Sequence, residues 1–155
     1  IAECFGLAYY KAQLASGSRL PLSGAALISV AERERKYLLP VASGLAELGF
    51  KLLATEGTAA FLAGHGIVAE TVKKLNQARP DLGDLIKNKA VQLIINTPIG
   101  RSGMIDDSYI RMMAIQYKVP YVTTMAAACS TVAGIKSAAS GKLTPKSLQE
   151  YQAGK

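Results

Sequence analysis

From Ala25 onward, short runs of apolar residues alternate with longer stretches in which apolar residues recur every three or four positions. Short apolar runs are typical of buried strands, and the longer spacing is typical of amphipathic helices. The alternation of strands and helices along the chain indicates an α/β fold with a parallel sheet. Near-continuous apolar strands such as Leu93-Ile94-Ile95 also indicate helices on both faces of the sheet, because both faces must then be covered. We therefore expect a three-layer sandwich with about five parallel strands.

The pattern predicts the following elements. Strands are expected at residues 25–30, 50–54, 67–72, 91–96 and 121–123. Helices are expected at 36–48, 58–64, 82–89, 109–117 and 125–139, with an earlier helix at 2–14 and a last one from Pro145 to about Tyr151, where Thr144 is the expected N-cap. The stretch 15–24 is rich in Gly, Ser and Pro, as linkers are, and predicts a domain boundary near Pro21.

Length and cysteine usage limit the class of protein. The 155 residues, half of them apolar, suffice for one domain with a single core. The apolar stretch at 25–31 is far shorter than the roughly 18 to 20 residues of a membrane helix, so no membrane span is expected. The chain opens on Ile1 in mid-pattern, which indicates a piece of a longer polypeptide. Cys4 and Cys129 lie outside any CxxC spacing, which favours the reduced cytosol over a disulfide or zinc framework.

The net charge of +7 raises the question of nucleic-acid binding. The basic residues are scattered, however, and no run exceeds a pair such as Lys73-Lys74. Aromatic residues that could stack on bases do not interleave with them. A small anionic ligand is therefore favoured over a nucleic acid.

Polar residues follow several of the predicted strands, at the edge where open parallel sheets bind ligands. The first group is Thr55-Glu56-Gly57-Thr58, after the second strand. Gly57 lets the backbone approach a ligand, and Thr58 is expected to start a helix whose free N–H groups attract an anion. The alternative, an ordinary N-cap at Thr58 and a turn at Gly57, explains the same residues and stays open.

The second group follows the fourth strand and consists of Asn96, Thr97, Pro98, Gly100 and Arg101. A turn needs proline and glycine. It does not need an amide, a hydroxyl and a cation together at the end of a strand. This combination favours a binding function.

Cations are expected at two further places. Lys73 and Lys74 follow the third strand, where one ammonium could enter the crevice; a solvated surface is the alternative. Arg33, Arg35 and Lys36 stand at the start of the first helix of the sheet domain. Cations oppose the helix dipole there, which costs stability unless an anion lies nearby.

No catalytic set or metal cluster can be assembled from the sequence. His65 is the only histidine and is best explained as a cap at the end of a short helix. Asp81 and Asp84 lie three residues apart, and Asp106-Asp107 precede a predicted helix, so capping explains them without chemistry. We expect no catalytic and no metal-binding residue in this chain.

Taken together, several segments resemble one family, the C-terminal allosteric domain of the large subunit of carbamoyl-phosphate synthase. They are residues 26–30, 49–59, 79–80, 94–98 and 116–124. Residues 5–14 resemble the tail of the preceding ATP-grasp half, and 20–21 its junction, so the resemblance divides the chain into 1–20 (tail and linker) and 21–155 (regulatory domain). The Thr-x-Gly-Thr element alone is shared with methylglyoxal synthase and with the N-terminal domain of the bifunctional purine-biosynthesis cyclohydrolase.

The resemblance implies a Rossmann-like regulatory domain of the methylglyoxal-synthase type, which binds UMP as inhibitor or IMP as activator in bacterial members. The family's phosphate loop matches Thr55, Gly57 and Thr58; its effector-contacting residues match Lys74, Asn96 and Thr97; and its ornithine-contacting position at the domain interface matches Thr123. Two departures are visible. Arg35 with Lys36 stands where the family has a lysine. Glu56 adds a carboxylate close to the proposed phosphate.

The resemblance also sets the wider expectations. The parent enzyme makes carbamoyl phosphate from bicarbonate, glutamine and ATP for pyrimidine and arginine biosynthesis in the cytoplasm. ATP, Mg or Mn, and K serve the parent enzyme, and no cofactor is expected in this domain. The expected partners are a nucleotide effector, the other domains of the large subunit, the glutaminase small subunit and a possible second copy, with no nucleic acid and no membrane.

Two alternatives remain open. One is a methylglyoxal synthase acting on dihydroxyacetone phosphate. That enzyme is expected to carry an Asp after the fourth strand and a His near the first, where this sequence has Asn96-Thr97 and Ser29. The other alternative is a docking module without a ligand.

Overall fold

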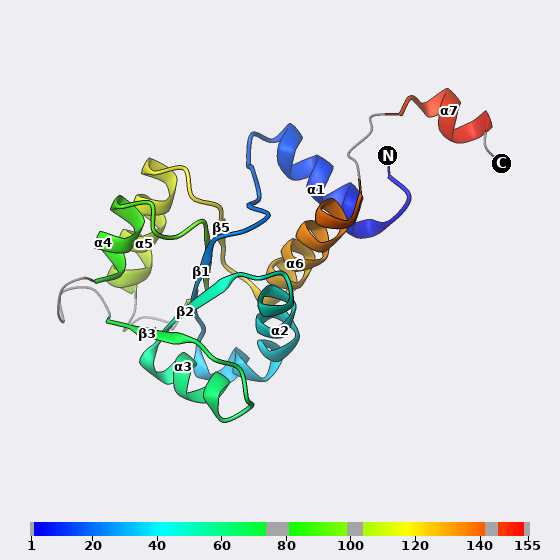
Figure 1. The fold of residues 1–155 in the computed structure, drawn as a ribbon. Helices are drawn as coiled ribbons and strands as arrows, with labels where there is room; N and C mark the ends of the chain where they lie inside the picture. Colours follow the sequence, from blue (N-terminus) through cyan, green and yellow to red (C-terminus); the bar gives the residue numbers. More distant parts are fainter. Residues whose placement is uncertain (1, 74–80, 99–103, 142–145, 154–155) are drawn as a thin grey trace.

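The computed structural model describes residues 2–73, 81–98, 104–141 and 146–153 (Figure 1). Its centre is a sheet of five strands in the order β3-β2-β1-β4-β5, and every neighbouring pair is parallel. The strands are β1 (Ala25–Ser29), β2 (Lys51–Thr55), β3 (Glu70–Val72), β4 (Leu93–Asn96) and β5 (Tyr121–Val122). The five-stranded parallel sheet expected from the sequence is confirmed.

Helices cover both faces of the sheet, as Figure 1 shows. On one face lie α1 (Phe5–Ala15), α2 (Leu39–Glu47), α3 (Glu56–Ala63) and α6 (Met125–Ser140). On the other lie α4 (Leu82–Lys87) and α5 (Met104–Gln116). The three-layer sandwich is thereby confirmed.

Successive strand residues enter different hydrophobic cores, because side chains alternate between the faces of a strand. Ile28 and Ile95 belong to the core beneath α2 and α6. Leu27 and Ile94 belong to the core beneath α4 and α5. All four are at most 1% exposed, which explains the near-continuous apolar strands of the sequence.

Helix α1 packs along α6, far from it in the sequence (Figure 1). The contact is close because Gly6 has no side chain: a Cβ there would stand 2.5 Å from the carbonyl oxygen of Ala133 and would also meet the hydroxyl of Ser137. The buried Tyr10 donates from its hydroxyl to the carbonyl oxygen of Leu20 at 3.3 Å. The segment before the sheet is therefore tied to the core, and the boundary near Pro21 stays a prediction.

The helix expected at 36–48 is divided in the structure. A 3-10 helix, η1, covers Glu32–Tyr37, and α2 begins only at Leu39. Pro40 explains the division, because a proline has no N–H to donate and fits only the first turn of an α-helix. Arg33, Arg35 and Lys36 consequently lie in η1, before α2.

Other boundaries also differ from the expected ones. Helix α3 begins at Glu56, with Thr55 at the N-cap position, so the prediction that Thr58 starts or caps this helix is wrong. Helix α5 begins at Met104, five positions before the expected 109. The last helix, α7, covers Leu148–Ala153, where the hydroxyl of Ser147 accepts from the N–H of Glu150 at 3.2 Å. The N-cap expected at Thr144, and Pro145 after it, lie outside the described residues.

Candidate functional site

The ends of β1, β2 and β4 meet at one edge of the sheet. Strand β1 lies between the other two: the chain passes from β1 to β2 and β3 on one side, and then crosses back to β4 on the other side of β1. Such a topological switch point is where open parallel sheets form a ligand crevice. The last residues of the three strands are Ser29, Thr55 and Asn96. By alternation from Leu27, Leu53 and Ile94, they project to the face of α4 and α5.

Buried threonine hydroxyls hold the chain that leaves β1. Oγ1 of Thr58 accepts from the N–H of Val30 at 3.3 Å and from the hydroxyl of Thr55 at 3.2 Å. Oγ1 of Thr97 accepts from the N–H of Ala31 at 2.9 Å. Thr58 is 1% exposed and Thr97 is 0% exposed. Both hydroxyl oxygens therefore accept hydrogen bonds from within the protein, and each hydroxyl can still donate its own proton to a further acceptor.

The guanidinium of Arg35 lies against the first turn of α3. A Cβ built on Gly57 would stand 2.6 Å from Nη2 of Arg35, so the missing side chain of Gly57 admits this cation. Nε of Arg35 is buried and has no hydrogen-bond partner among the described residues. Oε2 of the neighbouring Glu34 is likewise buried and has no partner among the described residues. A cation beside the positive end of a helix dipole is unfavourable unless an anion joins them.

Asn96 belongs to a polar group beneath the sheet edge. Its Nδ2 donates to Oδ1 of Asp107 and to the hydroxyl of Tyr121, at 2.9 Å each. Asn96 is 1% exposed, and its Oδ1 has no partner among the described residues. Burial raises the pKa of the Tyr121 phenol above its ordinary value; the hydrogen bond from Asn96 lowers it, the carboxylate of Asp107 raises it and Arg111 lowers it.

The remaining predicted site residues lie in different surroundings. Arg33 and Lys73 are exposed, and so is Thr123, between β5 and α6. Lys36 is exposed, and its Nζ lies 4.9 Å from the centre of the Tyr37 ring. Glu56 is exposed in the first turn of α3, where a carboxylate favours the helix dipole. Lys74 and Arg101 lie outside the described residues.

Capping explains several of the other polar residues, as expected. Nδ1 of His65 lies 2.9 Å from the carbonyl oxygen of Phe61, in the last turn of α3. Asp81 and Asp84 form a reciprocal capping box at the start of α4. For Asp107 the expected capping role is wrong, because α5 has already begun and the carboxylate reaches Asn96.

Among the residues that the structure describes, no group of three or more metal-binding side chains occurs. Within the same described part, Cys4 and Cys129 are free and exposed, and no helix there is long and apolar enough to cross a membrane.

The sequence patterns missed Asp107 and Tyr121 as members of this group. Asp107 lies 11 positions and Tyr121 lies 25 positions from Asn96 in the chain. Local spacing carries no signal for contacts that form only when α5 and β5 fold back onto β4.

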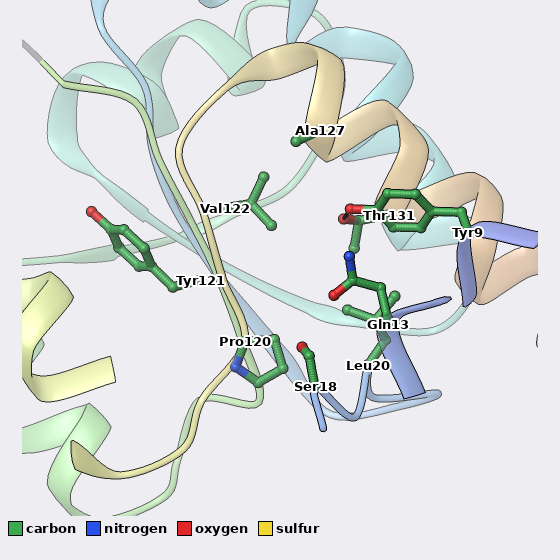
Figure 2. A pocket seen from close by; sticks show the side chains of 9 residues that line it. All are labelled: Tyr9, Gln13, Ser18, Leu20, Pro120, Tyr121, Val122, Ala127 and Thr131. Carbon is green, nitrogen blue, oxygen red and sulfur yellow. Dashed lines mark hydrogen bonds between the residues drawn. The ribbon is translucent and has the colours of Figure 1, made fainter. Parts of the chain in front are cut away.

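A separate cavity of about 90 Å³ lies between α1, β5 and α6 (Figure 2). In Figure 2 the side chain of Val122 points toward this cavity and that of Tyr121 points away from it. The hydroxyls of Tyr9 and Thr131 meet at 3.3 Å on its wall. Its lining side chains carry no charge: Tyr9, Gln13, Ser18, Leu20, Pro120, Tyr121, Val122, Ala127 and Thr131.

Comparison with known proteins gives one matching family model, the MGS-like domain, over residues 37–123. The chain is 45% identical over 155 residues to the "Carbamoyl phosphate synthase large chain, C-terminal section" of Methanopyrus kandleri, covering 99% of this chain and 29% of that one. It is 46% identical over 148 residues to the carbamoyl phosphate synthase large chain of Archaeoglobus fulgidus, covering 95% of this chain and 14% of that one. The chain thus spans less than a third of the length of these relatives.

Solved structures of similar fold include a methylglyoxal synthase. The methylglyoxal synthase from Elizabethkingia anophelis NUHP1 superposes with a TM-score of 0.58, covering 74% of this chain and 79% of that one. The two sequences are 14% identical. At this level of identity the comparison shows a shared fold and nothing more.

Proposed function

The chain belongs to the MGS-like domain family, and from that premise we propose that it is a regulatory domain that binds a nucleoside monophosphate effector, such as UMP or IMP. The effector occupies the sheet edge formed by the ends of β1, β2 and β4. Its phosphate lies between Arg35 and the first turn of α3. The domain contributes no catalytic residue.

Arg35 is the observation that carries this proposal. Its guanidinium lies beside Gly57 in the first turn of α3, and its buried Nε has no partner among the described residues. The free N–H groups of that turn and a guanidinium are two kinds of donor that phosphate oxygens accept. An anion between them offsets the repulsion between the cation and the helix dipole.

The neighbouring residues complete the proposed site. Thr55 ends β2 and Thr58 follows it beyond Gly57, while Asn96 ends β4 and Thr97 comes directly after it. Lys36, Lys74 and Arg101 are proposed as further contacts to the anion, from the resemblance and the strand-end pattern. A site of neutral hydroxyls and cations suits a phosphorylated ligand.

The proposed setting is a carbamoyl-phosphate synthase large chain in the cytoplasm, since relatives bearing that name cover nearly the whole of this chain. The effector regulates the chemistry of the remaining large-chain domains and, through them, of the glutaminase small subunit. ATP, metal ions and K belong to those domains. Such regulation requires that the effector bind two states of the enzyme with different affinity.

Titration calorimetry with UMP, IMP and inorganic phosphate tests the proposal. We expect at least one nucleotide to bind, and its affinity to fall as salt rises, because the contact is ionic. Arg35→Gln should weaken binding about tenfold or more, as for a charge-assisted contact. Arg33→Gln is the matched control, since Arg33 is exposed in the same 3-10 turn. Equal affinities of the two variants for the nucleotide would mean that the anion does not bind at Arg35.

A methylglyoxal synthase is the competing function, because the fold is shared and a carboxylate, that of Asp107, reaches the end of β4. A coupled assay with dihydroxyacetone phosphate separates the two. We expect no turnover. Turnover would replace the regulatory proposal by the enzymatic one, and a chain that neither binds a nucleotide nor turns over would be a docking module.

Ornithine binding is not expected from this chain alone. Thr123 is exposed, and the sequence around it contains no Asp or Glu. The ammonium groups of ornithine would lose water there without a carboxylate in return. We propose that the rest of this site lies in the preceding domain, so that a full-length large chain binds ornithine and this chain does not; ornithine binding by this chain, abolished in Thr123→Val, would contradict the assignment.

A further inference from the structure

The orientation of the Asn96 amide determines which kind of hydrogen bond the end of β4 offers. Nδ2 of Asn96 is 2.9 Å from Oδ1 of Asp107 and 2.9 Å from the hydroxyl of Tyr121. An ionised carboxylate has no proton and only accepts. The atom that faces Asp107 must therefore be the amide nitrogen, because a flipped amide would place its oxygen against the carboxylate.

The two hydrogen bonds use both protons of the amide nitrogen. The carbonyl oxygen is left over: Oδ1 of Asn96 is buried and has no partner among the described residues. A buried acceptor without a partner is costly and rare in folded proteins. It gains a hydrogen bond only from a group that brings its own donor.

We infer that Asp107 and Tyr121 are positioning residues that hold the amide of Asn96 with its oxygen free, so that this end of the site selects a ligand group bearing a hydrogen-bond donor. Phosphate oxygens, which accept at neutral pH, are thereby directed away from Asn96. The donor is a ribose hydroxyl or an N–H of the base. This inference rests on the proposed function and adds to it the polarity of the ligand in the site.

The spacing of the strands agrees with this polarity. Strand β1 separates β2 from β4, so the ends of β2 and β4 lie two interstrand spacings, about 10 Å, apart. The cation of Arg35 stands by the helix that follows β2, and Asn96 ends β4. A nucleoside monophosphate whose phosphate lies at Arg35 extends its sugar or base across β1 toward Asn96.

Substitutions of equal size test the orientation. Asp107→Asn supplies a donor to Asn96, which permits the flipped amide and removes the fixed acceptor. Tyr121→Phe removes one acceptor but leaves the orientation to Asp107. The double variant Asn96→Asp with Asp107→Asn exchanges the two groups, so that a carboxylate oxygen again accepts from the ligand while the pair keeps one negative charge.

The probes are UMP, IMP, their 2′,3′-dideoxy forms, their base N-methylated forms and inorganic phosphate, with affinities measured by calorimetry. In the unsubstituted chain we expect one of the two modifications, of the sugar or of the base, to weaken nucleotide binding about tenfold, because about one hydrogen bond to the ligand is lost. The modification that weakens binding shows whether the sugar or the base carries the donor. In Asp107→Asn that difference should disappear, while inorganic phosphate binds as before. The exchanged double variant should regain it, and Tyr121→Phe should keep most of it.

The outcomes separate this inference from the proposed function. Nucleotide binding in which neither modification matters, or a preference that Asp107→Asn leaves intact, overturns the positioning role alone. A uniform loss that includes inorganic phosphate indicates a structural role for Asp107 and likewise overturns it. The absence of any nucleotide binding to the unsubstituted chain overturns both proposals.

Discussion

The guanidinium of Arg35 occupies the space that a side chain on Gly57 would fill. Nη2 of Arg35 stands 2.6 Å from the position of a Cβ on Gly57, and Cζ stands 3.4 Å from it. Gly57 has no positive φ, so its backbone suits any residue. The glycine is needed for the approach of Arg35. This role differs from the one that the sequence predicts for Gly57, the close approach of a ligand to the backbone.

Gly57→Ala should therefore separate stability from binding. Alanine in the first turn of α3 raises helix propensity by up to about 1 kcal/mol, and the end of a long arginine side chain can move aside. We expect an unchanged or raised melting temperature together with phosphate and nucleotide binding weakened about tenfold. Gly64→Ala is the control, because its Cβ would meet nothing closer than 3.5 Å. An unaltered affinity of Gly57→Ala for phosphate and nucleotide would mean that Arg35 does not contact the ligand.

Thr97 is expected to matter for folding even without a ligand. Its hydroxyl accepts from the N–H of Ala31 at 2.9 Å, and the residue is 0% exposed. Thr97→Val keeps the shape and leaves that N–H without a partner, which should cost about 1 to 3 kcal/mol of unfolding free energy. Thr97→Ser keeps the hydroxyl and should cost less. Urea unfolding compares the two, and a larger loss in the serine variant would assign the role to the methyl group.

The sheet was predictable because its signal is local and strong. Buried strands such as Leu93-Ile94-Ile95 need no knowledge of the rest of the chain. The start of α2 was expected at Lys36 but lies at Leu39. Pro40 carries the signal for the later start, but Tyr37 and Leu38 extend the apolar pattern before it. The shift in α3 is similar: Thr58 resembles an N-cap, yet the helix starts at Glu56 and uses the Thr58 hydroxyl to hold Val30.

The site was predictable only in outline. Strand ends and polar residues pointed to Thr55, Thr58, Asn96 and Thr97, and these do gather at one edge. The patterns could not show that their hydroxyls and amide are already used within the protein, because hydrogen bonds such as Asn96 to Tyr121 join distant segments. Spacing also could not distinguish Arg35 from Arg33, because the two are only two positions apart. In the structure Arg35 lies against Gly57, whereas Arg33 is exposed.

Docking of α1 onto α6 should fail when Gly6 gains a side chain. A Cβ there would stand 2.5 Å from the backbone oxygen of Ala133, which can move only with its helix. We expect Gly6→Ala to cost about 1 to 3 kcal/mol by overpacking, although alanine favours a helix, and to expose 15–24 to proteases. Gly141→Ala is the control, because its nearest contact would be an ordinary 3.7 Å. Equal stability in the two variants would mean that α1 is not held by this contact.

Tyr121 should make the chain less stable in alkali. Burial raises the pKa of its phenol, so the unfolded chain, with an ordinary pKa of about 10, loses this proton first as pH rises. Between that pH and the higher pKa of the folded state, the unfolded state binds fewer protons, and the unfolding free energy falls. Asp107 and Arg111 act on the phenol in opposite directions, and Asn96 donates to it.

Tyr121→Phe lacks this titration and shares every other tyrosine with the unsubstituted chain. The unfolding free energies of the two proteins, measured in urea from about pH 8 to about pH 11, should therefore converge as pH rises, because only the unsubstituted chain pays for keeping Tyr121 protonated. A constant difference across this range would mean that Tyr121 titrates alike in the folded and unfolded states, and that the polar group around Asn96 is open to water.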